Sequence, residues 1–397
     1  MTPRQNAILV FNAGSSSIKA ALYGLSEDRH APLELISRFH LSGLGGPHPQ
    51  IRLTDAQEKV LLERSLPASC DHETGARTVL ERLLKDGQIN LLAVGHRVVH
   101  GGSTYTAPVL ITDDVLRDLS TFIRLAPQHQ PHNLRAIRLI REMLPTLPQI
   151  ACFDTAFHSS MPDMATLVPL PRDIRNKGVR NYGFHGLSYE YIAGRLPQLR
   201  KDGRIYGRCI VAHMGHGVSM CALKDGKSIA TSMGFTALAG LPMGFRSGTV
   251  DPGILLYLLE EEGLSVAELK DLLYHKSGLY GLSGVSDDVR DLLQKDSPDT
   301  RRALDYFAYR INREIGSLTA ALGGLDALVF TAGIGENSPE IRRQVCALAA
   351  WLDIRLDEGK NAQNAALIST PDSPVAVWVI PTNEEVMIAR HTIALLP

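Results

Sequence analysis

Three runs of the chain place glycine and small polar residues directly after a short apolar stretch: Asn12–Lys19, His213–Gly217 and Thr331–Asn337. A strand that ends in such a turn exposes backbone N–H groups and hydroxyls, which suit phosphate oxygens. In the first run, Lys19 adds a positive charge and Asn12 can bind a metal-coordinated water. A β-hairpin turn would have the same composition without any ligand, but the repetition of the pattern favours phosphate binding.

Two charged residues lie where apolar runs end. Arg97 is well placed to clamp a carboxylate or phosphate with two hydrogen bonds, although a surface ion pair is the commoner fate of a single arginine. Asp154 follows the apolar run 149–153, and open α/β sheets place ligand chemistry at the carboxyl ends of their strands. Asp154 could therefore orient a substrate or bind a metal, and it could equally cap the next helix.

Three more residues could take part in phosphoryl transfer. His185 lies between glycines 183 and 186, so it could donate to a transferring phosphoryl group or cap a loop. Arg246 stands at the centre of the glycine-framed loop 240–248 and is similar to an arginine finger. Glu384 follows the last apolar run, where a carboxylate could hold magnesium or begin a helix.

The sequence does not contain a complete copy of two better-known nucleotide-binding motifs. Gly226-Lys-Ser lacks the earlier glycine of a phosphate-binding P-loop, because position 221 is Cys. Gly333-Ile-Gly lacks the third glycine of a dinucleotide fingerprint.

Length and composition restrict the class of protein. At about 100–200 residues per domain, 397 residues predict two domains. A formal net charge of -1 gives no electrostatic basis for binding nucleic acid or an acidic membrane surface. No apolar stretch approaches the roughly 20 residues of a membrane span. Five cysteines without a CxxC pair fit a reducing compartment, so we expect a cytoplasmic protein with neither nucleic acid nor membrane as partner.

Strand-like apolar runs alternate with helical periodicity, which indicates an α/β architecture. The first two glycine runs lie half the chain apart, which suggests a duplicated domain. We expect strands at 8–11, 91–99, 149–153, 209–212, 328–330 and 375–380. We expect helices at 74–84, 132–144, 188–196, 252–262, 265–274, 299–321, 338–351 and 383–394, and loops at 41–49 and 198–207.

Taken in order, these segments resemble the acetate kinase family over essentially the whole chain. The motifs that carry the resemblance are Asn12-Ala-Gly-Ser-Ser-Ser, His96-Arg-Val-Val-His-Gly-Gly, Phe153-Asp-Thr-Ala-Phe-His, Tyr182-Gly-Phe-His-Gly, Met243-Gly-Phe-Arg-Ser-Gly, Thr331-Ala-Gly-Ile-Gly-Glu-Asn and Pro381-Thr-Asn-Glu-Glu.

The resemblance implies two duplicated ribonuclease-H-like domains of the sugar-kinase, actin and heat-shock-chaperone superfamily, closing around an interdomain cleft. It implies an N-terminal acyl-kinase domain of residues 1–154 with the returning C-terminal helix 385–397, and a nucleotide-binding domain of residues 155–384. It also implies a homodimer, with an ATP/ADP co-substrate and Mg²⁺, or Mn²⁺ in its place.

The resemblance assigns roles to individual residues. Asn12 and Glu384 would position the metal, and Arg97 would hold the substrate carboxylate beside Val99, Leu125 and Ala237. Asp154 would orient the substrate and act as the acid/base group, while His185 and Arg246 would stabilise the transferring phosphoryl group, with His129 assisting. The nucleotide would be bound by Lys19, His213, Met214, Gly215, His216, Gly217, Asp288, Val289, Arg290, Gly333, Ile334, Gly335, Glu336 and Asn337.

The implied reaction is reversible, direct in-line transfer of a phosphoryl group from ATP to a carboxylate oxygen of acetate. A carboxylate is already a nucleophile, so catalysis would depend on positioning and on neutralising charge.

This chain departs from the family pattern at four positions, one of which is Ala239 in place of Glu. His216 stands where the family usually has Asn, and a bulkier side chain that can carry charge could alter nucleotide binding. Ala237 replaces a proline that helps wall the acyl pocket, which leaves more room. Gln130 also replaces Asn, without a consequence that the sequence alone predicts.

Three alternatives remain open at the level of sequence. A propionate or butyrate kinase would share the chemistry, because one methylene in an apolar pocket is worth only about 1–3 kcal/mol. A non-catalytic nucleotide-binding regulator would have no need of the full set of charged residues. A sugar kinase would need a general base for a hydroxyl group, which fits the motifs less well.

Overall fold

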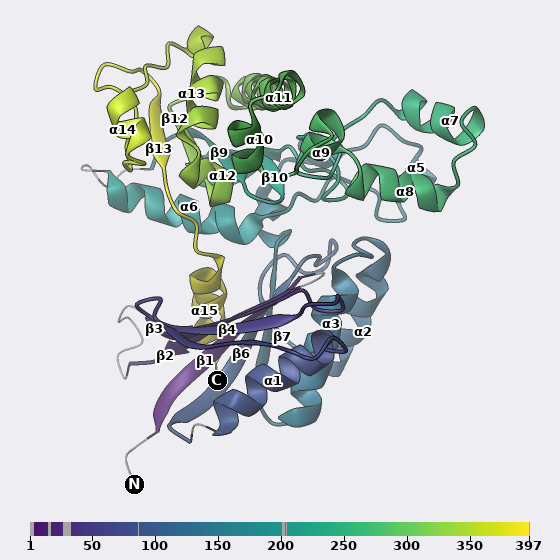
Figure 1. Ribbon diagram of the computed structural model, residues 1–397, viewed down its shortest axis with the longest axis vertical. Helices are drawn as coiled ribbons and strands as arrows, with labels where there is room; N and C mark the ends of the chain where they lie inside the picture. The colour runs from purple at the N-terminus through teal and green to yellow at the C-terminus, as the bar shows by residue number, and fades with distance from the viewer. Residues whose placement is uncertain are drawn as a thin grey trace. The chain divides into compact units, whose positions relative to one another are not determined.

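The computed structural model describes residues 4–14, 17–26, 33–85, 87–200, 203 and 205–396. The chain divides into two compact units (Figure 1). Unit 1 comprises residues 1–156 and 383–397, and unit 2 comprises residues 157–382. None of the helices among the described residues is long and apolar enough to cross a membrane.

Unit 1 is built on an eight-stranded sheet of order β5-β4-β3-β2-β1-β6-β8-β7. The strands β1 to β5 form an antiparallel meander, β6 and β8 run parallel to β1, and the short β7 closes the edge. Their bounds are β1 (Gln5–Ala13), β2 (Ile18–Gly24), β3 (Glu34–Ser42), β4 (Gln50–Asp55), β5 (Val60–Ser65), β6 (Ile89–Val98), β7 (Val109–Leu110) and β8 (Gln149–Phe153).

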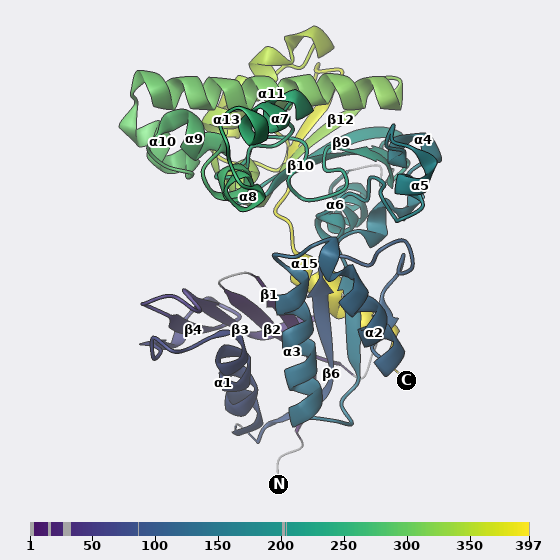
Figure 2. The same cartoon turned by 90° about the vertical axis from the view of Figure 1, so that its right-hand side faces the viewer.

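Helices cover both faces of this sheet. Figure 2 shows α1 and α3 side by side on one face, with α15 behind the sheet. The helical bounds are α1 (His72–Lys85), α2 (Asp113–Thr121), a 3-10 turn (Phe122–Arg124), α3 (Gln130–Met143) and α15 (Glu384–Ala394).

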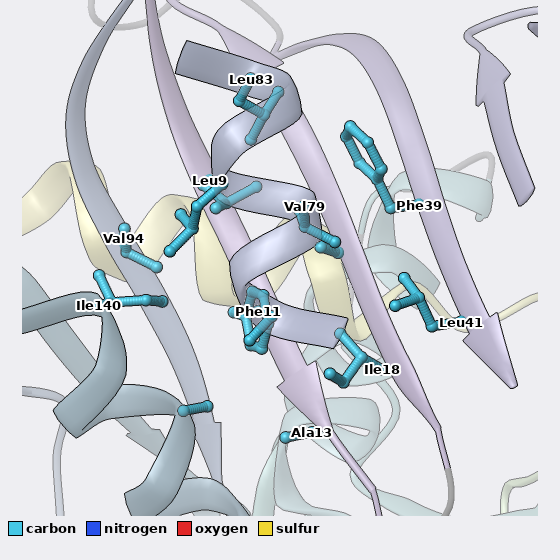
Figure 3. Packing of buried hydrophobic residues seen from close by; sticks show 14 of the residues in the cluster. Leu9, Phe11, Ala13, Ile18, Phe39, Leu41, Val79, Leu83, Val94 and Ile140 are labelled. Atoms are coloured by element: carbon cyan, nitrogen blue, oxygen red, sulfur yellow. The ribbon is translucent and has the colours of Figure 1, made fainter. Parts of the chain in front are cut away.

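Every second side chain of β1 enters the hydrophobic core under α1 and α3 (Figure 3). Leu9 and Phe11 of β1 pack with Val79 of α1 and Ile140 of α3, and all four side chains are buried. Because side chains alternate across a strand, Asn12 points to the opposite face, which α15 covers.

Gly95 of β6 allows α15 to approach the sheet. A Cβ at this position would lie 2.1 Å from Thr392 Oγ1 and 2.7 Å from Ile388 Cγ2, both on α15. The absence of a side chain at Gly95 therefore lets α15 lie close to β6, with its first residue, Glu384, on the same face as Arg97.

Unit 2 contains a five-stranded sheet of order β11-β10-β9-β12-β13. An antiparallel meander is followed by two strands parallel to its first member, which is also the pattern of β3-β2-β1-β6-β8 in unit 1. The bounds are β9 (Arg208–Met214), β10 (Val218–Lys224), β11 (Lys227–Thr231), β12 (Ala327–Thr331) and β13 (Ala376–Val379). This shared pattern of the two sheets confirms the duplication predicted from the sequence.

The helices of unit 2 pack on both faces of its sheet. Figure 1 shows α6 and α11 on opposite faces. The bounds are α4 (Asp163–Thr166), α5 (Arg172–Arg175), α6 (Gly186–Leu199), α7 (Pro252–Glu260), α8 (Val266–His275), α9 (Gly278–Ser283), α10 (Val289–Lys295), α11 (Pro298–Leu322), α12 (Ala332–Asn337), α13 (Pro339–Leu348) and α14 (Glu358–Ala362), with 3-10 turns at Ala156–Ser160 and Ala350–Leu352.

One helix in each unit packs on the first strand of that unit's sheet. The chain leaves β8 of unit 1 and forms α6, which packs on β9 of unit 2 through Tyr189, Ile192 and Leu196. It leaves β13 of unit 2 and forms α15, which packs on β1, β6 and β8 of unit 1. Helix α15 thus lies in the same unit as the N-terminal part of the chain.

Every predicted strand and helix is present within a few residues of its expected bounds. The prediction of a glycine-rich turn at 331–337 was wrong. The third glycine run forms the short helix α12 directly after β12, with Ala332 in the left-handed region at a φ of 63°. The first two runs are hairpin turns, and residues 15 and 16 of the first lie outside the described residues. All five cysteines are free and buried.

Candidate active site

Arg97 and Asp154 form the most constrained charged pair of unit 1. Arg97 lies at the end of β6 and Asp154 directly follows β8, the parallel neighbour of β6. Arg97 Nε donates to Asp154 Oδ1 at 2.9 Å, and Nη2 donates to Oδ2 at 2.5 Å. Burial alone would lower the pKa of Arg97, but the charges of Asp154 and Glu384 outweigh it and raise this pKa, so the guanidinium stays charged.

Two side-chain oxygens, from Asn12 and Glu384, lie next to this pair. Arg97 Nη1 donates to Asn12 Oδ1 at 3.3 Å, because β1 and β6 are parallel neighbours. Glu384 Oε2, at the first residue of α15, lies 3.9 Å from Arg97 Nε. An amide oxygen, two carboxylates and a guanidinium therefore meet on one face of the sheet.

Lys19 adds a positive charge beside Asn12. The two residues face each other across β1 and β2, so their side chains lie on the same face. Lys19 in turn faces His40 of β3, whose pKa is lowered by burial and then by the charges of Lys19 and Arg52. A row of basic groups thus continues outward from Asn12.

Two predicted acyl-site residues, and His129, which is predicted to assist at the phosphoryl group, lie near the start of α3. Val99 and Leu125 are buried, and His129 stands directly before the first residue of the helix. The backbone N–H of Val99 and the carbonyl of Ala13 both hydrogen-bond Asn133 of α3. Their positions therefore depend on the first turn of this helix.

His185 is held on three sides within unit 2. It has a φ of 59° immediately before α6, a left-handed conformation that is uncommon outside glycine. Its Nδ1 lies 2.8 Å from Ser219 Oγ, which also bonds the hydroxyl of Tyr189. Its ring stacks on His213 with centroids 4.1 Å apart. Such a strained, well-braced side chain is typical of a functional position.

The hairpin turn between β9 and β10 lies against His185. A Cβ on Gly217 would lie 3.0 Å from His185 Nε2, so glycine permits this close approach. Gly215 N–H bonds the carbonyl of Gly217, which closes the turn, and His216 at its tip is exposed. His213 Nδ1 bonds Ser188 Oγ at 2.8 Å.

Arg246 and Ala237 are in direct contact. Arg246 Nη1 donates to the carbonyl of Ala237 at 3.1 Å. The same nitrogen lies 3.8 Å from the position that a Cβ on Gly217 would occupy. Arg246, His185 and the hairpin turn are thus brought together in unit 2, as the sequence predicts for residues acting on one phosphoryl group.

The α12 residues divide into an exposed edge and a structural part. Gly333 and Asn337 are exposed, and Asn337 Nδ2 donates to the carbonyl of Gly333. The carboxylate of Glu336 instead accepts from the backbone N–H groups of Ala332 and Thr382, at 2.8 and 3.0 Å. In this structure Glu336 therefore joins α12 to the segment that follows β13.

The segment 288–290 begins α10. Asp288 accepts from the backbone and the guanidinium of Arg290, and it caps the helix. The buried Val289 packs in the interior of unit 2. Asp288 therefore caps α10 in this structure, and the nucleotide contact of residues 288–290 stays a prediction.

Sequence reasoning did not find several residues that orient the site. Ser219 and Tyr189 hold His185, and Asn133 joins β1 to the loop after β6. Arg342 is fully buried and donates to the carbonyls of Gly335 and Glu336. These are ordinary helix and strand residues in the sequence, and only tertiary contacts reveal their role.

Comparison with known proteins agrees with this geometry. The model of the family described as the Acetokinase family matches residues 7–390. Acetate kinase of Rhodopseudomonas palustris is 51% identical over 391 residues, covering 97% of each chain. A crystal structure of Porphyromonas gingivalis acetate kinase superposes with a TM-score of 0.87 at 38% identity, covering 99% of this chain and 100% of that one. A propionate kinase from Francisella tularensis superposes with a TM-score of 0.90 at 35% identity, covering 98% and 100%.

Two units that repeat one strand pattern, with glycine hairpins at the end of the first strand of each, define the duplicated actin-like fold of phosphotransferases. Within that class, the chain belongs to the acetokinase family.

Proposed function

We propose that this protein catalyses reversible phosphoryl transfer between ATP and the carboxylate of acetate, giving acetyl phosphate and ADP. The observation that carries the proposal is the Arg97–Asp154 pair, beside Asn12 and Glu384. Two N–H groups of Arg97 hold Asp154 and a third donates to Asn12, so the other N–H groups of the guanidinium can bind a substrate carboxylate. Family membership supports ATP as co-substrate, together with a divalent metal.

The metal in this proposal is Mg²⁺, which Mn²⁺ could replace. Amide and carboxylate oxygens are hard ligands, so the side chains of Asn12 and Glu384 fit Mg²⁺. Magnesium commonly takes one or two protein oxygens and completes its shell with water and substrate phosphates. When bound, it supplies positive charge to the phosphate oxygens.

The chain's own residues account for the other requirements of transfer. Arg97 orients the acid, and Asp154 orients Arg97. His185 and Arg246 supply donors to the phosphoryl oxygens, and the hairpin turn 213–217 supplies backbone N–H groups. A carboxylate oxygen attacks the γ-phosphorus, and the bond from phosphorus to the ADP oxygen breaks. A carboxylate has no proton to lose, so in this proposal Asp154 orients the acid rather than removing a proton.

Propionate is the second candidate acid. Ala237 has a small side chain where the resembling family usually has proline, and the structural similarity includes a propionate kinase. A pocket enlarged by a few methylenes would admit propionate without excluding acetate, since each methylene is worth about 1–3 kcal/mol.

A homodimer in the cytoplasm completes the proposal. Helix α7 is apolar, yet none of its side chains is buried, and Ile254, Leu256 and Tyr257 are each more than half exposed. An exposed apolar helix is typical of a protein interface, and a second copy of the chain is the partner we propose. Five free thiols fit a reducing compartment. Sedimentation should give a dimer that Leu256→Glu dissociates, whereas an unchanged mass for this variant would exclude α7 as the interface.

The test is ATP-dependent formation of acyl phosphate, trapped as the hydroxamate, with acetate, propionate and butyrate compared at equal concentration. We expect the highest kcat/KM with acetate and strict dependence on Mg²⁺ or Mn²⁺. A higher kcat/KM with propionate than with acetate would favour the second candidate acid. The absence of acyl phosphate with all three acids would refute kinase activity.

A further inference from the structure

The first turn of α3 carries two buried amide side chains on one face. Gln130 and Asn133 are three residues apart, so both project from the same side of the helix. Gln130 is completely buried and Asn133 is 2% exposed. Buried amides are retained where their hydrogen bonds are satisfied, so their partners indicate what they hold.

Gln130 bonds both polar groups of one backbone residue. Its Oε1 accepts from the N–H of His100 at 3.3 Å, and its Nε2 donates to the carbonyl of His100 at 3.1 Å. The same Nε2 lies 3.3 Å from the carbonyl of Leu119 at the end of α2. The side-chain amide of Gln130 therefore bonds the backbone of the loop after β6 in the same way as the backbone of a neighbouring strand would.

Asn133 joins two strand ends. Its Oδ1 accepts from the N–H of Val99 at 3.1 Å, and its Nδ2 donates to the carbonyl of Ala13 at 2.8 Å. Ala13 follows Asn12 on β1, and Val99 lies two residues beyond Arg97. The single amide of Asn133 therefore fixes the end of β1 relative to the end of β6.

We infer that Gln130 and Asn133 form an amide brace that positions the acid-binding residues of the reaction. The inference rests on the proposed function and deepens it. The brace holds Val99 and His100 directly, and it holds Asn12 and Arg97 through the adjoining backbone. Neither amide contacts a reacting atom, so both are positioning residues. Displacing a substrate by about 1 Å can cost a factor of about 100 in rate, so a small loosening is measurable.

The test compares Gln130→Leu with Gln130→Asn. Leucine keeps the volume and removes all three hydrogen bonds, whereas asparagine keeps the amide on a shorter side chain. We expect Gln130→Leu to raise the KM for acetate at least tenfold and to leave the KM for ATP within twofold. We expect Gln130→Asn to lie between this variant and wild type.

Gln149→Leu is the matched control. Gln149 is a buried amide of the same unit, and it bonds the ring of His96 instead of the loop. We expect this control to lower the melting temperature without changing the KM for acetate. Equal KM changes in both glutamine variants, or an unchanged KM in Gln130→Leu, would overturn the inference.

Amide hydrogen exchange provides a readout that does not need activity. Gln130→Leu should accelerate exchange in peptides covering residues 98–102, and Gln149→Leu should not. Unchanged exchange in Gln130→Leu would refute the brace even if the enzyme were active. A wild-type chain that forms no acyl phosphate would instead refute the proposed function, while the exchange rates would still decide whether Gln130 holds this loop.

Discussion

The guanidinium of Arg97 makes a bidentate pair with the carboxylate of Asp154: Nε donates to Oδ1 and Nη2 donates to Oδ2. Two parallel bonds fix the guanidinium plane as well as its position. The nitrogen left outside the pair, Nη1, contacts Asn12. Asp154 therefore determines the direction in which Arg97 can offer its remaining donors to an acid.

Replacing Arg97 by lysine should weaken acid binding. An ammonium group keeps the charge but cannot bond Asp154 and a second carboxylate in a fixed plane. We expect Arg97→Lys to raise the KM for acetate at least tenfold while the KM for ATP changes less than threefold. Steady-state kinetics with each substrate varied in turn would measure both values.

Arg208 provides the control for this substitution. It also donates two hydrogen bonds to a carboxylate, from Nε and Nη2 to Oδ1 of Asp326 in unit 2, but this pair is more exposed to solvent. Arg208→Lys should leave both KM values unchanged, because surface pairs contribute little. An equal effect of the two lysine variants on acetate would mean that Arg97 has only a structural role.

Replacing Asp154 by asparagine should lower kcat. The amide keeps the shape but loses the charge and one of the two acceptors, so Arg97 is free to turn toward Glu384. We expect a loss of kcat of about 100-fold or more, as for misaligned reactants in general. Pre-steady-state measurements would show whether the chemical step is slowed, and a kcat within threefold of wild type would contradict the role given to Asp154.

Replacing Ala237 by proline should narrow the acid specificity. The carbonyl of Ala237 accepts from Arg246 Nη1, and proline keeps that carbonyl. We expect Ala237→Pro to lower kcat/KM for propionate relative to acetate by about 10- to 200-fold, the range for one methylene in an apolar pocket. A constant ratio between the two acids in competition assays would show that residue 237 does not contact the acyl chain.

Three buried histidines should make stability depend on pH. Burial lowers the pKa of His96, His100 and His158 to about 4. An unfolded histidine has a pKa near about 6.5, so the unfolded chain binds more protons between these two values. The contribution of these three histidines to the free energy of unfolding should therefore be fully present well above about pH 6.5 and fall as the pH drops toward about 4, where it is lost.

His158→Gln isolates one of these groups. His158 bonds Ser228 and the carbonyl of Phe184, and glutamine can make polar contacts there without titrating. The variant should lose less melting temperature than wild type between pH 7.5 and pH 5. An identical loss in both proteins would mean that His158 is protonated at the same pH in the folded and unfolded states.

The sequence predicts the strands and the long helices well, because those depend on local pattern. Arg97 and Asp154 stand at the ends of apolar runs that the sheet makes neighbours. It predicts contacts poorly where they depend on the packing of distant elements. The sequence alone does not predict the role of Gln130, because only the fold brings His100 and Leu119 within hydrogen-bond distance of its side chain. The glycines of 331–337 favour a turn, but the run forms the short helix α12. The nucleotide contact of Glu336 stays a prediction, and in the structure its carboxylate accepts from the N–H of Thr382.

The central claim is that a carboxylate oxygen becomes bonded to phosphorus. The most direct test supplies acetate labelled with ¹⁸O in its carboxylate, together with ATP and Mg²⁺, and follows the product by ³¹P NMR. The account predicts acetyl phosphate whose phosphorus signal is shifted by one ¹⁸O in the bridge to the acyl carbon. ATP turnover without ¹⁸O attached to phosphorus would contradict it.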